Sequence, residues 1–352
     1  MVVLLAASCS KREERAAAPP VAKAAPVAKA ALADDIAALR TEMEAREDAG
    51  DDVAAAAAGD KLVAQLRERK LTGDPSYAST LETYARVLFS SGRWKDAEAP
   101  LQEALATPRG TSDKVLRSSL LFQLGTVYSE QRRNDEAIPV LVESLELSEK
   151  VHGPDAYPTS NSVEVLAAVY DYAGRYAEAE PMFRRALRLS EKHHGATSEE
   201  VGRVLTNLAL NLVYQDRDAE ALPLYERAIP MLESSKGFER SSLAAAHRGI
   251  AQIHHKLHKL ALAESSYRRA VEVSTEANGA EHPFTAMDHY NLAIILEDQR
   301  KLPAAIEACT KSEVIRSKVL AADHPYRVQT EEACARMRAV GARPLSKSPK
   351  RR

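Results

Sequence analysis

The sequence predicts an all-α protein built from repeated helix pairs. The chain has 352 residues, is rich in strong helix formers, and holds only 14 glycines, about 4% against an average near 7%. Alanine recurs at Ala97, Ala137, Ala179, Ala221, Ala263 and Ala305, so that successive residue numbers differ by 40, 42, 42, 42 and 42. Twelve residues earlier stands a second small residue each time, at Ala85, Gly125, Ala167, Ala209, Ala251 and Ala293. Two columns in one register predict an α-solenoid of stacked helix-turn-helix units.

The sequence of residues 1–31 predicts a membrane-targeting segment followed by a linker. An apolar run from Met1 to Ala7 ends in small residues just before Cys9 and is far shorter than the roughly 18 residues of a transmembrane helix. This resembles the lipobox of bacterial lipoproteins, which implies a lipid on Cys9 and a place in the cell envelope, facing the periplasm. The alternative is an ordinary N-terminus of a cytoplasmic protein. We expect the Ala/Pro/Lys stretch 11–31 to be an extended tether.

Residues 32–75 are expected to be helical and to hold a degenerate first repeat. One repeat length before Ala97 lies Ala55, and it follows a turn signal at Gly50. Apolar residues at Leu62, Val63 and Leu66 have the spacing of an inner helix face.

Residues 76–327 are expected to form six full repeats. In the first helix of a unit, apolar residues recur at i, i+3, i+4 and i+7, as at Leu121, Leu124, Gly125 and Tyr128. The tight turn between the two helices holds glycine at Gly92 and Gly174, which suits a left-handed residue. A third column, with the same repeat spacing, predicts an αL cap after the second helix at Gly153, Gly195, Gly237 and Gly279.

The C-terminal end is expected to close the array. Residues 328–340 are predicted to be a capping helix, and residues 341–352 a basic, disordered tail. Cys309 and Cys334 both fall at core positions of the register. We expect two buried thiols there, with a disulfide in an oxidising envelope as the alternative.

The repeat resembles the tetratricopeptide repeat, and its 42-residue spacing resembles the kinesin light chain subclass. The resemblance is carried by AGRYAEAEPMFRRAL at 173–187, SEKHHG at 190–195, TNLA at 206–209 and YNLA at 290–293, and it covers about residues 78–327. It implies a right-handed superhelix in which the first helices line a concave groove. It therefore implies a non-catalytic scaffold that binds a protein or peptide partner.

The groove positions follow from the helical period, because they lie opposite the core stripe of each first helix. The predicted groove residues are Arg203, Asn207, Tyr214, Arg248, Gln252, His255, Lys256, Tyr290 and Asn291. Their carboxamides would hydrogen-bond a peptide backbone, while Arg203 and Arg248 would favour an acidic ligand. Asn207 and Asn291 stand where the kinesin-type repeat carries groove asparagines, but repeats one, two, three and five hold Thr83, Gln123, Val165 and Gly249 there, which disfavours cargo recognition of the kinesin kind. The alternative is that these side chains only solvate the face.

No residue pattern predicts an enzyme or a cofactor. The chain lacks a Gly-rich phosphate loop, a serine elbow, an HExxH motif and a paired-carboxylate motif. Its 48 basic and 50 acidic side chains disfavour nucleic acid as a partner. His247 and His254 occupy core positions of repeat five, where we expect a packed, hydrogen-bonded pair and no metal. A metal-dependent protein that uses these histidines is the alternative of another class.

Overall fold

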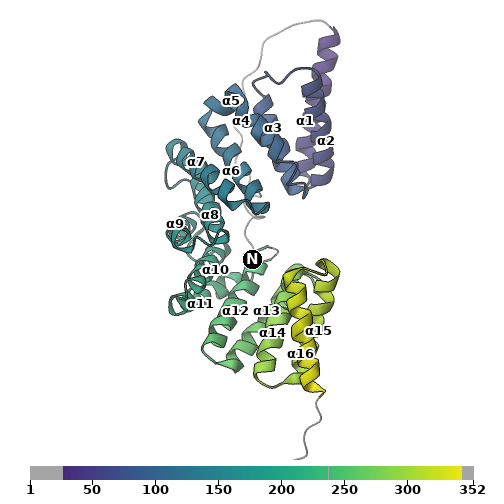
Figure 1. Ribbon diagram of the computed structural model, residues 1–352. Coiled ribbons are helices and arrows are strands. Elements are labelled where there is room, and N and C mark those ends of the chain that lie inside the picture. Colours follow the sequence, from purple (N-terminus) through teal and green to yellow (C-terminus); the bar gives the residue numbers. More distant parts are fainter. Residues whose placement is uncertain (1–26, 237, 343–352) are drawn as a thin grey trace, which may run out of the picture. The chain divides into compact units, whose positions relative to one another are not determined.

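The computed structural model describes residues 27–236 and 238–342, and all regular elements within these ranges are helices (Figure 1). The described chain forms two compact units that divide between Leu189 and Ser190. The first unit comprises α1 (Val27–Asp48), α2 (Asp52–Glu68), α3 (Tyr77–Ser90), α4 (Glu98–Ala106), α5 (Pro108–Ser112), α6 (Lys114–Glu130), α7 (Asn134–His152), α8 (Tyr157–Tyr172) and most of α9 (Tyr176–His194).

The second unit is a run of antiparallel helix pairs closed by one last helix. It comprises α10 (Glu199–Tyr214), α11 (Asp218–Leu232), α12 (Phe238–Lys256), α13 (Leu260–Asn278), α14 (Pro283–Asp298), α15 (Leu302–Val319) and α16 (Pro325–Gly341). The predicted all-α solenoid is confirmed. No helix among the described residues has both the length and the apolar character required to span a bilayer.

The two columns of small residues are where the helices of the array pack most closely. All six residues of the alanine column, from Ala97 to Ala305, are 0% exposed. The second column is equally tight: a Cβ added to Gly125 of α6 would lie 2.4 Å from Cγ of Leu141 in α7. A larger side chain at either column would force the helices apart, since protein interiors leave no spare volume.

The turn inside each helix pair places one left-handed residue at the same register. These residues are Gly50, Gly92, Arg132, Gly174, Asp216, His258 and Arg300, with φ between 55° and 81°. Four of them carry a side chain, so the expected link between this turn and glycine is only partial. A single αL residue costs a non-glycine about 1–2 kcal/mol, which the packing of the flanking helices offsets.

The glycines between repeats do not adopt the predicted αL cap. Gly153 has φ 96° and ψ 156°, and Gly279 has φ 93° and ψ 158°. An αL residue has ψ near about 47°, so these two residues lie instead in an extended region of positive φ that is essentially open to glycine alone. Gly195 also has positive φ, 88°, and Gly237 lies outside the described residues. Glycine is therefore required here more strictly than in the turns.

Both ends of the described chain differ from the expected boundaries. Helix α1 starts at Val27, inside the stretch expected to be an extended tether, because alanine-rich sequence propagates a helix readily. Helix α16 starts three residues before the predicted 328, since Pro325 fits the first helical position and the His324 ring accepts a hydrogen bond from the Tyr326 amide. Cys9 and the basic tail beyond Ala342 lie outside the described residues.

Helix α5 is an element that the repeat pattern did not predict. It lies in the linker between Ala97 and Ala137, which is the shortest interval of the alanine column. The Thr107 hydroxyl accepts a hydrogen bond from the Gly110 amide, and Pro108 occupies the first helical position. A capping hydroxyl followed by proline is sufficient to start a single helical turn.

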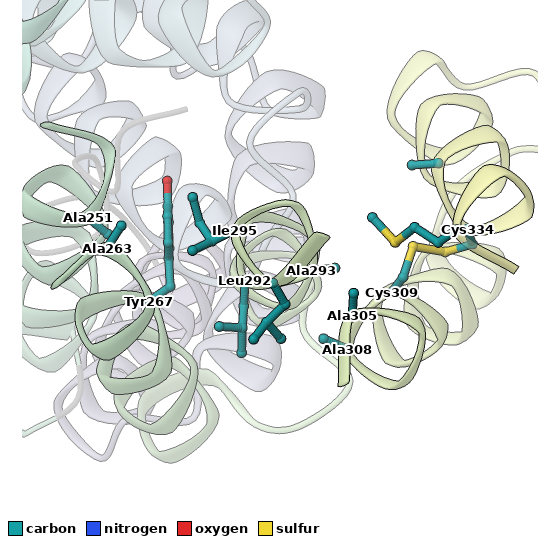
Figure 2. Close-up of a cluster of buried hydrophobic side chains, with 13 residues drawn as sticks. Ala251, Ala263, Tyr267, Leu292, Ala293, Ile295, Ala305, Ala308, Cys309 and Cys334 are labelled. Atoms are coloured by element: carbon teal, nitrogen blue, oxygen red, sulfur yellow. A yellow bond between two sulfur atoms is a disulfide. The ribbon is translucent and has the colours of Figure 1, made fainter. Parts of the chain in front are cut away.

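Cys309 of α15 and Cys334 of α16 form a disulfide, which corrects the expectation of two buried thiols (Figure 2). Their Cα atoms lie 5.6 Å apart, within the usual disulfide range. Both sulfurs belong to a buried cluster that includes Ala305, Ala308 and Met337. The packing of the last two helices brings together cysteines that are 25 residues apart in sequence.

Candidate partner-binding surface

The predicted groove residues all lie on the first helices of the second unit. We call these nine residues the first-helix surface. Helix α10 carries Arg203, Asn207 and Tyr214, helix α12 carries Arg248, Gln252, His255 and Lys256, and helix α14 carries Tyr290 and Asn291. Exposure varies widely among them, from 42% at Tyr214 to 6% at Asn207.

Arg248 is bound inside the protein. Its Nε and Nη2 donate hydrogen bonds of 2.5 and 3.1 Å to the two carboxylate oxygens of Asp288 in α14. The Asp288 side chain is 0% exposed and that of Arg248 is 16% exposed. Burial alone would lower the pKa of Arg248, yet the Asp288 charge raises it. The ion pair thus links two consecutive first helices, α12 and α14.

The other basic residues of the first-helix surface also lie near carboxylates. Lys256 Nζ lies 3.2 Å from oxygens of both Asp216 and Asp218, which belong to the preceding repeat. Burial opposes these contacts, but the two hydrogen bonds raise the pKa of Lys256. His255 Nε2 lies 2.7 Å from Asp298, and Arg203 Nε lies 4.0 Å from Glu239.

This charge pairing corrects the expectation that Arg248 selects an acidic ligand, whereas for Arg203, whose Nε lies 4.0 Å from Glu239, the expectation stays a prediction. An arginine that is mostly buried and already holds a carboxylate through two hydrogen bonds has its charge compensated inside the protein. The basic residues at the centre of this surface therefore join repeats together.

The carboxamides behave differently from the charged residues. Asn207, Gln252 and Asn291 lie on three consecutive first helices, and none makes a hydrogen bond within the part of the chain that the structure describes. The Nδ2 of Asn207 is buried and unpartnered. Each carboxamide offers two donors and one acceptor, and a buried amide left unpaired costs about 1–3 kcal/mol. Unused hydrogen-bonding capacity thus recurs on three consecutive first helices.

Repeat five lacks the asparagine that repeats four and six carry, and the reason is steric. Gly249 occupies the position equivalent to Asn207 and Asn291, and a Cβ there would lie 2.2 Å from Cζ of Tyr225. The Tyr225 ring comes from α11 and is fully buried. An asparagine at this position would collide with the ring, and Gln252, one helical turn later, is the nearest carboxamide.

The pattern of helices, columns and turns has counterparts among known proteins. Residues 116–192, 164–234 and 242–313 match the tetratricopeptide repeat family, and together they cover more than half of the chain. The chain belongs to the tetratricopeptide repeat family. Proteins of this family generally mediate protein–protein interaction, and their scaffold is generally non-enzymatic. No curated protein sequence matches the chain.

Solved structures with a similar fold include three repeat proteins. BtubC (BKLC) from P. vanneervenii is 20% identical, with a TM-score of 0.50 over 70% of this chain and 91% of its own. A tetratricopeptide repeat protein from Parabacteroides merdae is 16% identical, with a TM-score of 0.59 over 87% and 99%. Kinesin light chain-like repeats from Podosopora anserina are 18% identical, with a TM-score of 0.48 over 58% and 96%. At these identities the likeness to the first two structures shows the fold alone.

The histidines of the fifth tetratricopeptide repeat are packed but not hydrogen-bonded, contrary to expectation. His247 Nε2 and His254 Nδ1 are buried without a partner. Burial lowers the pKa of both rings, that of His247 to about 4, and the nearby Arg269 charge adds to the effect at His247. Among the described residues, no three His, Cys, Asp or Glu side chains are grouped closely enough to hold a metal ion.

A cleft of about 290 Å³ lies away from the first-helix surface, among α13, α14 and α15. Its lining combines apolar residues such as Val271 and Leu296 with the charged Arg268 and Lys311, and it contains none of the nine predicted groove residues. His289, whose Nδ1 is buried and unpartnered, also lines it. Sequence reasoning did not predict this cleft, because its wall joins three helices from two repeats.

Asp288 is the functional neighbour that sequence reasoning missed. It holds Arg248 in place, yet it lies on the core side of α14. A signal was present in the register: the same column holds Thr80, Leu120, Ser162, Val204 and Ala246, all buried and none charged. An aspartate in a column of buried, uncharged residues indicates a buried cationic partner, since a lone buried carboxylate is strongly disfavoured.

Proposed function

We propose that the protein is a non-catalytic scaffold whose first-helix surface binds an extended or helical peptide segment of a protein partner. The observation that carries this proposal is the row of three carboxamides, Asn207, Gln252 and Asn291, which make no hydrogen bond within the described residues. Tyr214, which is 42% exposed at the end of α10, would offer the peptide an aromatic contact on the same surface.

Carboxamides suit the recognition of a backbone. An extended peptide presents alternating N–H and C=O groups, and a carboxamide can donate to one and accept from the other. Such contacts depend little on the sequence of the ligand. Because Arg248, His255 and Lys256 already contact carboxylates, we propose that the surface selects its ligand by backbone and shape and does not require an acidic segment.

Binding is tested with a triple variant, Asn207→Ala, Gln252→Ala and Asn291→Ala. We expect it to lose capture of the native partner from envelope extracts at unchanged helicity, since three amide contacts are removed. The matched control is Gln329→Ala on α16, an exposed carboxamide outside the surface. Capture by the triple variant at the wild-type level would place binding elsewhere.

We also propose that the protein is a bacterial lipoprotein of the cell envelope, anchored through Cys9. The Cys309–Cys334 disulfide supports this location, because disulfides persist in oxidising compartments and are rare in the cytosol. Incorporation of radiolabelled palmitate in the native host tests the anchor, with Cys9→Ser as the control. No label in the wild-type chain would favour the alternative, a cytoplasmic adaptor.

The domain division remains part of this proposal. We propose six repeats over 76–327, a cap over 328–340, and a degenerate first repeat formed by α1 and α2. The α1–α2 turn supports the last point, because its left-handed Gly50 lies one repeat length before Gly92. Ala55, which precedes Ala97 by the same interval, is likewise 0% exposed.

A further inference from the structure

Arg316 of α15 is a buried cation with no carboxylate partner among the described residues. The residue is 5% exposed, and its contacts within those residues are hydrogen bonds from Nη1 to the Tyr326 carbonyl, at 2.7 Å, and to the Thr330 hydroxyl, with the Tyr290 and Tyr326 rings close by. Arg248, one repeat earlier, is paired with a fully buried aspartate. The same unit therefore compensates one buried arginine and leaves the other without an internal anion.

Burial disfavours the charged form of both arginines, but only Arg248 has a carboxylate that reverses the effect. Burial lowers the pKa of Arg316, whereas the carboxylate of Asp288 reverses this effect at Arg248. A buried guanidinium without an anion is costly, and proteins normally pair such a charge or place a ligand on it. The register also marks the site, because the equivalent positions hold only uncharged residues: Ser148, Ser190, Leu232 and Ser274.

The geometry leaves one edge of the guanidinium available. The Tyr290 and Tyr326 ring centroids lie 5.0 and 5.6 Å from Cζ of Arg316, within cation–π range. Nη1 is already held by α16. Nε and Nη2 donate no hydrogen bond within the described residues, and the residue as a whole is 5% exposed. These two N–H groups form the fork that a carboxylate accepts bidentately.

We propose that Arg316, with Tyr290 and Tyr326, forms a carboxylate-binding site at the C-terminal end of the array. The carboxylate is presented by a peptide, either as its C-terminus or as an Asp or Glu side chain. Only this assignment to a peptide rests on the proposed function, through Tyr290, which belongs to the first-helix surface; the carboxylate site itself does not.

The test uses the full chain labelled with ¹⁵N-arginine and follows the Nε–Hε signals by NMR. The Arg316 signal is assigned by its absence from Arg316→Lys. Titration with sodium acetate at constant ionic strength should shift this signal saturably, whereas acetamide should not. The internal control is Arg336, which already contacts Glu297 at 2.7 Å and should not respond. A linear acetate response equal to that of Arg336 would overturn the proposal, as would a stronger response to inorganic phosphate.

The Arg316→Lys variant keeps the positive charge but removes the two parallel N–H donors, Nε and Nη2. We expect acetate to bind it about tenfold more weakly, read from the Tyr326 amide signal of ¹⁵N-tyrosine-labelled protein and compared with the wild-type chain labelled in the same way, because one charge-assisted hydrogen bond is lost. Unchanged affinity would show that a point charge suffices and would contradict bidentate binding. Should the variant not fold, the Arg316 signal is assigned instead by its nuclear Overhauser contacts with the Tyr290 and Tyr326 rings, and the wild-type titration still decides the question.

Two small ligands separate the sources of the carboxylate. N-acetylalanine carries a C-terminal carboxylate, and the α-amide of N-acetylaspartate carries one on a side chain. Tighter binding of one of them than of acetate identifies the source. If neither exceeds acetate, the assignment to a peptide is wrong while the carboxylate site stands, and the proposed function is then judged by its own capture experiment.

Discussion

Replacing Asp288 by alanine should destabilise the second unit strongly while leaving its surface almost unchanged. The side chain is 0% exposed, so no partner can contact it, and its loss leaves the mostly buried Arg248 without its anion. Two unit charges about 4 Å apart attract by about 4 kcal/mol at an effective dielectric constant near 20. Breaking one partner of a buried pair typically costs about 3–5 kcal/mol, so both routes give the same magnitude.

The assay is urea unfolding followed by helical circular dichroism, with the slope of the transition compared between variants. The double variant Arg248→Met with Asp288→Leu should recover most of the loss, because it removes both charges and fills similar volume. The matched control is Asp298→Ala, whose 44% exposed carboxylate faces His255 at the surface. It should cost under about 1 kcal/mol. If Asp288→Ala lowers the unfolding free energy by no more than the control Asp298→Ala does, the Arg248–Asp288 pair does not hold the two repeats together.

Three further predictions follow from packing, the disulfide and a buried histidine. Gly125→Ala should lose about 1–3 kcal/mol of unfolding free energy by urea titration, because its Cβ overlaps a leucine side chain; Gly73→Ala, in open space, should lose almost nothing. Reducing the Cys309–Cys334 bond should lower stability by about 3 kcal/mol, given its 25-residue separation, and should have no effect on the double serine variant. His247 is neutral when folded: its pKa falls from 6.5 to about 4 on folding, so its stabilising effect is complete above pH 6.5 and is lost as pH falls toward 4. His247→Leu should flatten the stability curve over that window; an unchanged slope would show that this ring does not titrate.

The fold was predictable because repetition multiplies a weak signal. One alanine indicates little, but six in register define both the helix pairs and their closest contact, and all six are fully buried. Local capping chemistry was harder to predict. The register located Gly153 and Gly279 correctly as positive-φ residues, but ψ depends on how the next repeat packs, and the αL cap was wrong.

The candidate surface was predictable in position but not in electrostatics. Helical periodicity placed Arg248 and Asn207 on first helices, whereas the partner of Arg248 lies 40 residues away on the core side of another helix. A single sequence does not show which acidic residue forms an ion pair with a given arginine. The same limit applies to Cys309 and Cys334, whose pairing depends on how α15 and α16 pack.

The most direct test of the central claim is site-specific photocrosslinking in the native host. A photoreactive phenylalanine analogue replaces Tyr214 on the first helix α10 or, as the control, Leu262 on the second helix α13; the two positions are 42% and 49% exposed. We predict that one partner protein crosslinks to position 214 and not to position 262, and that the triple carboxamide variant abolishes the product. A partner crosslinked to position 262 alone would contradict binding through the first-helix surface.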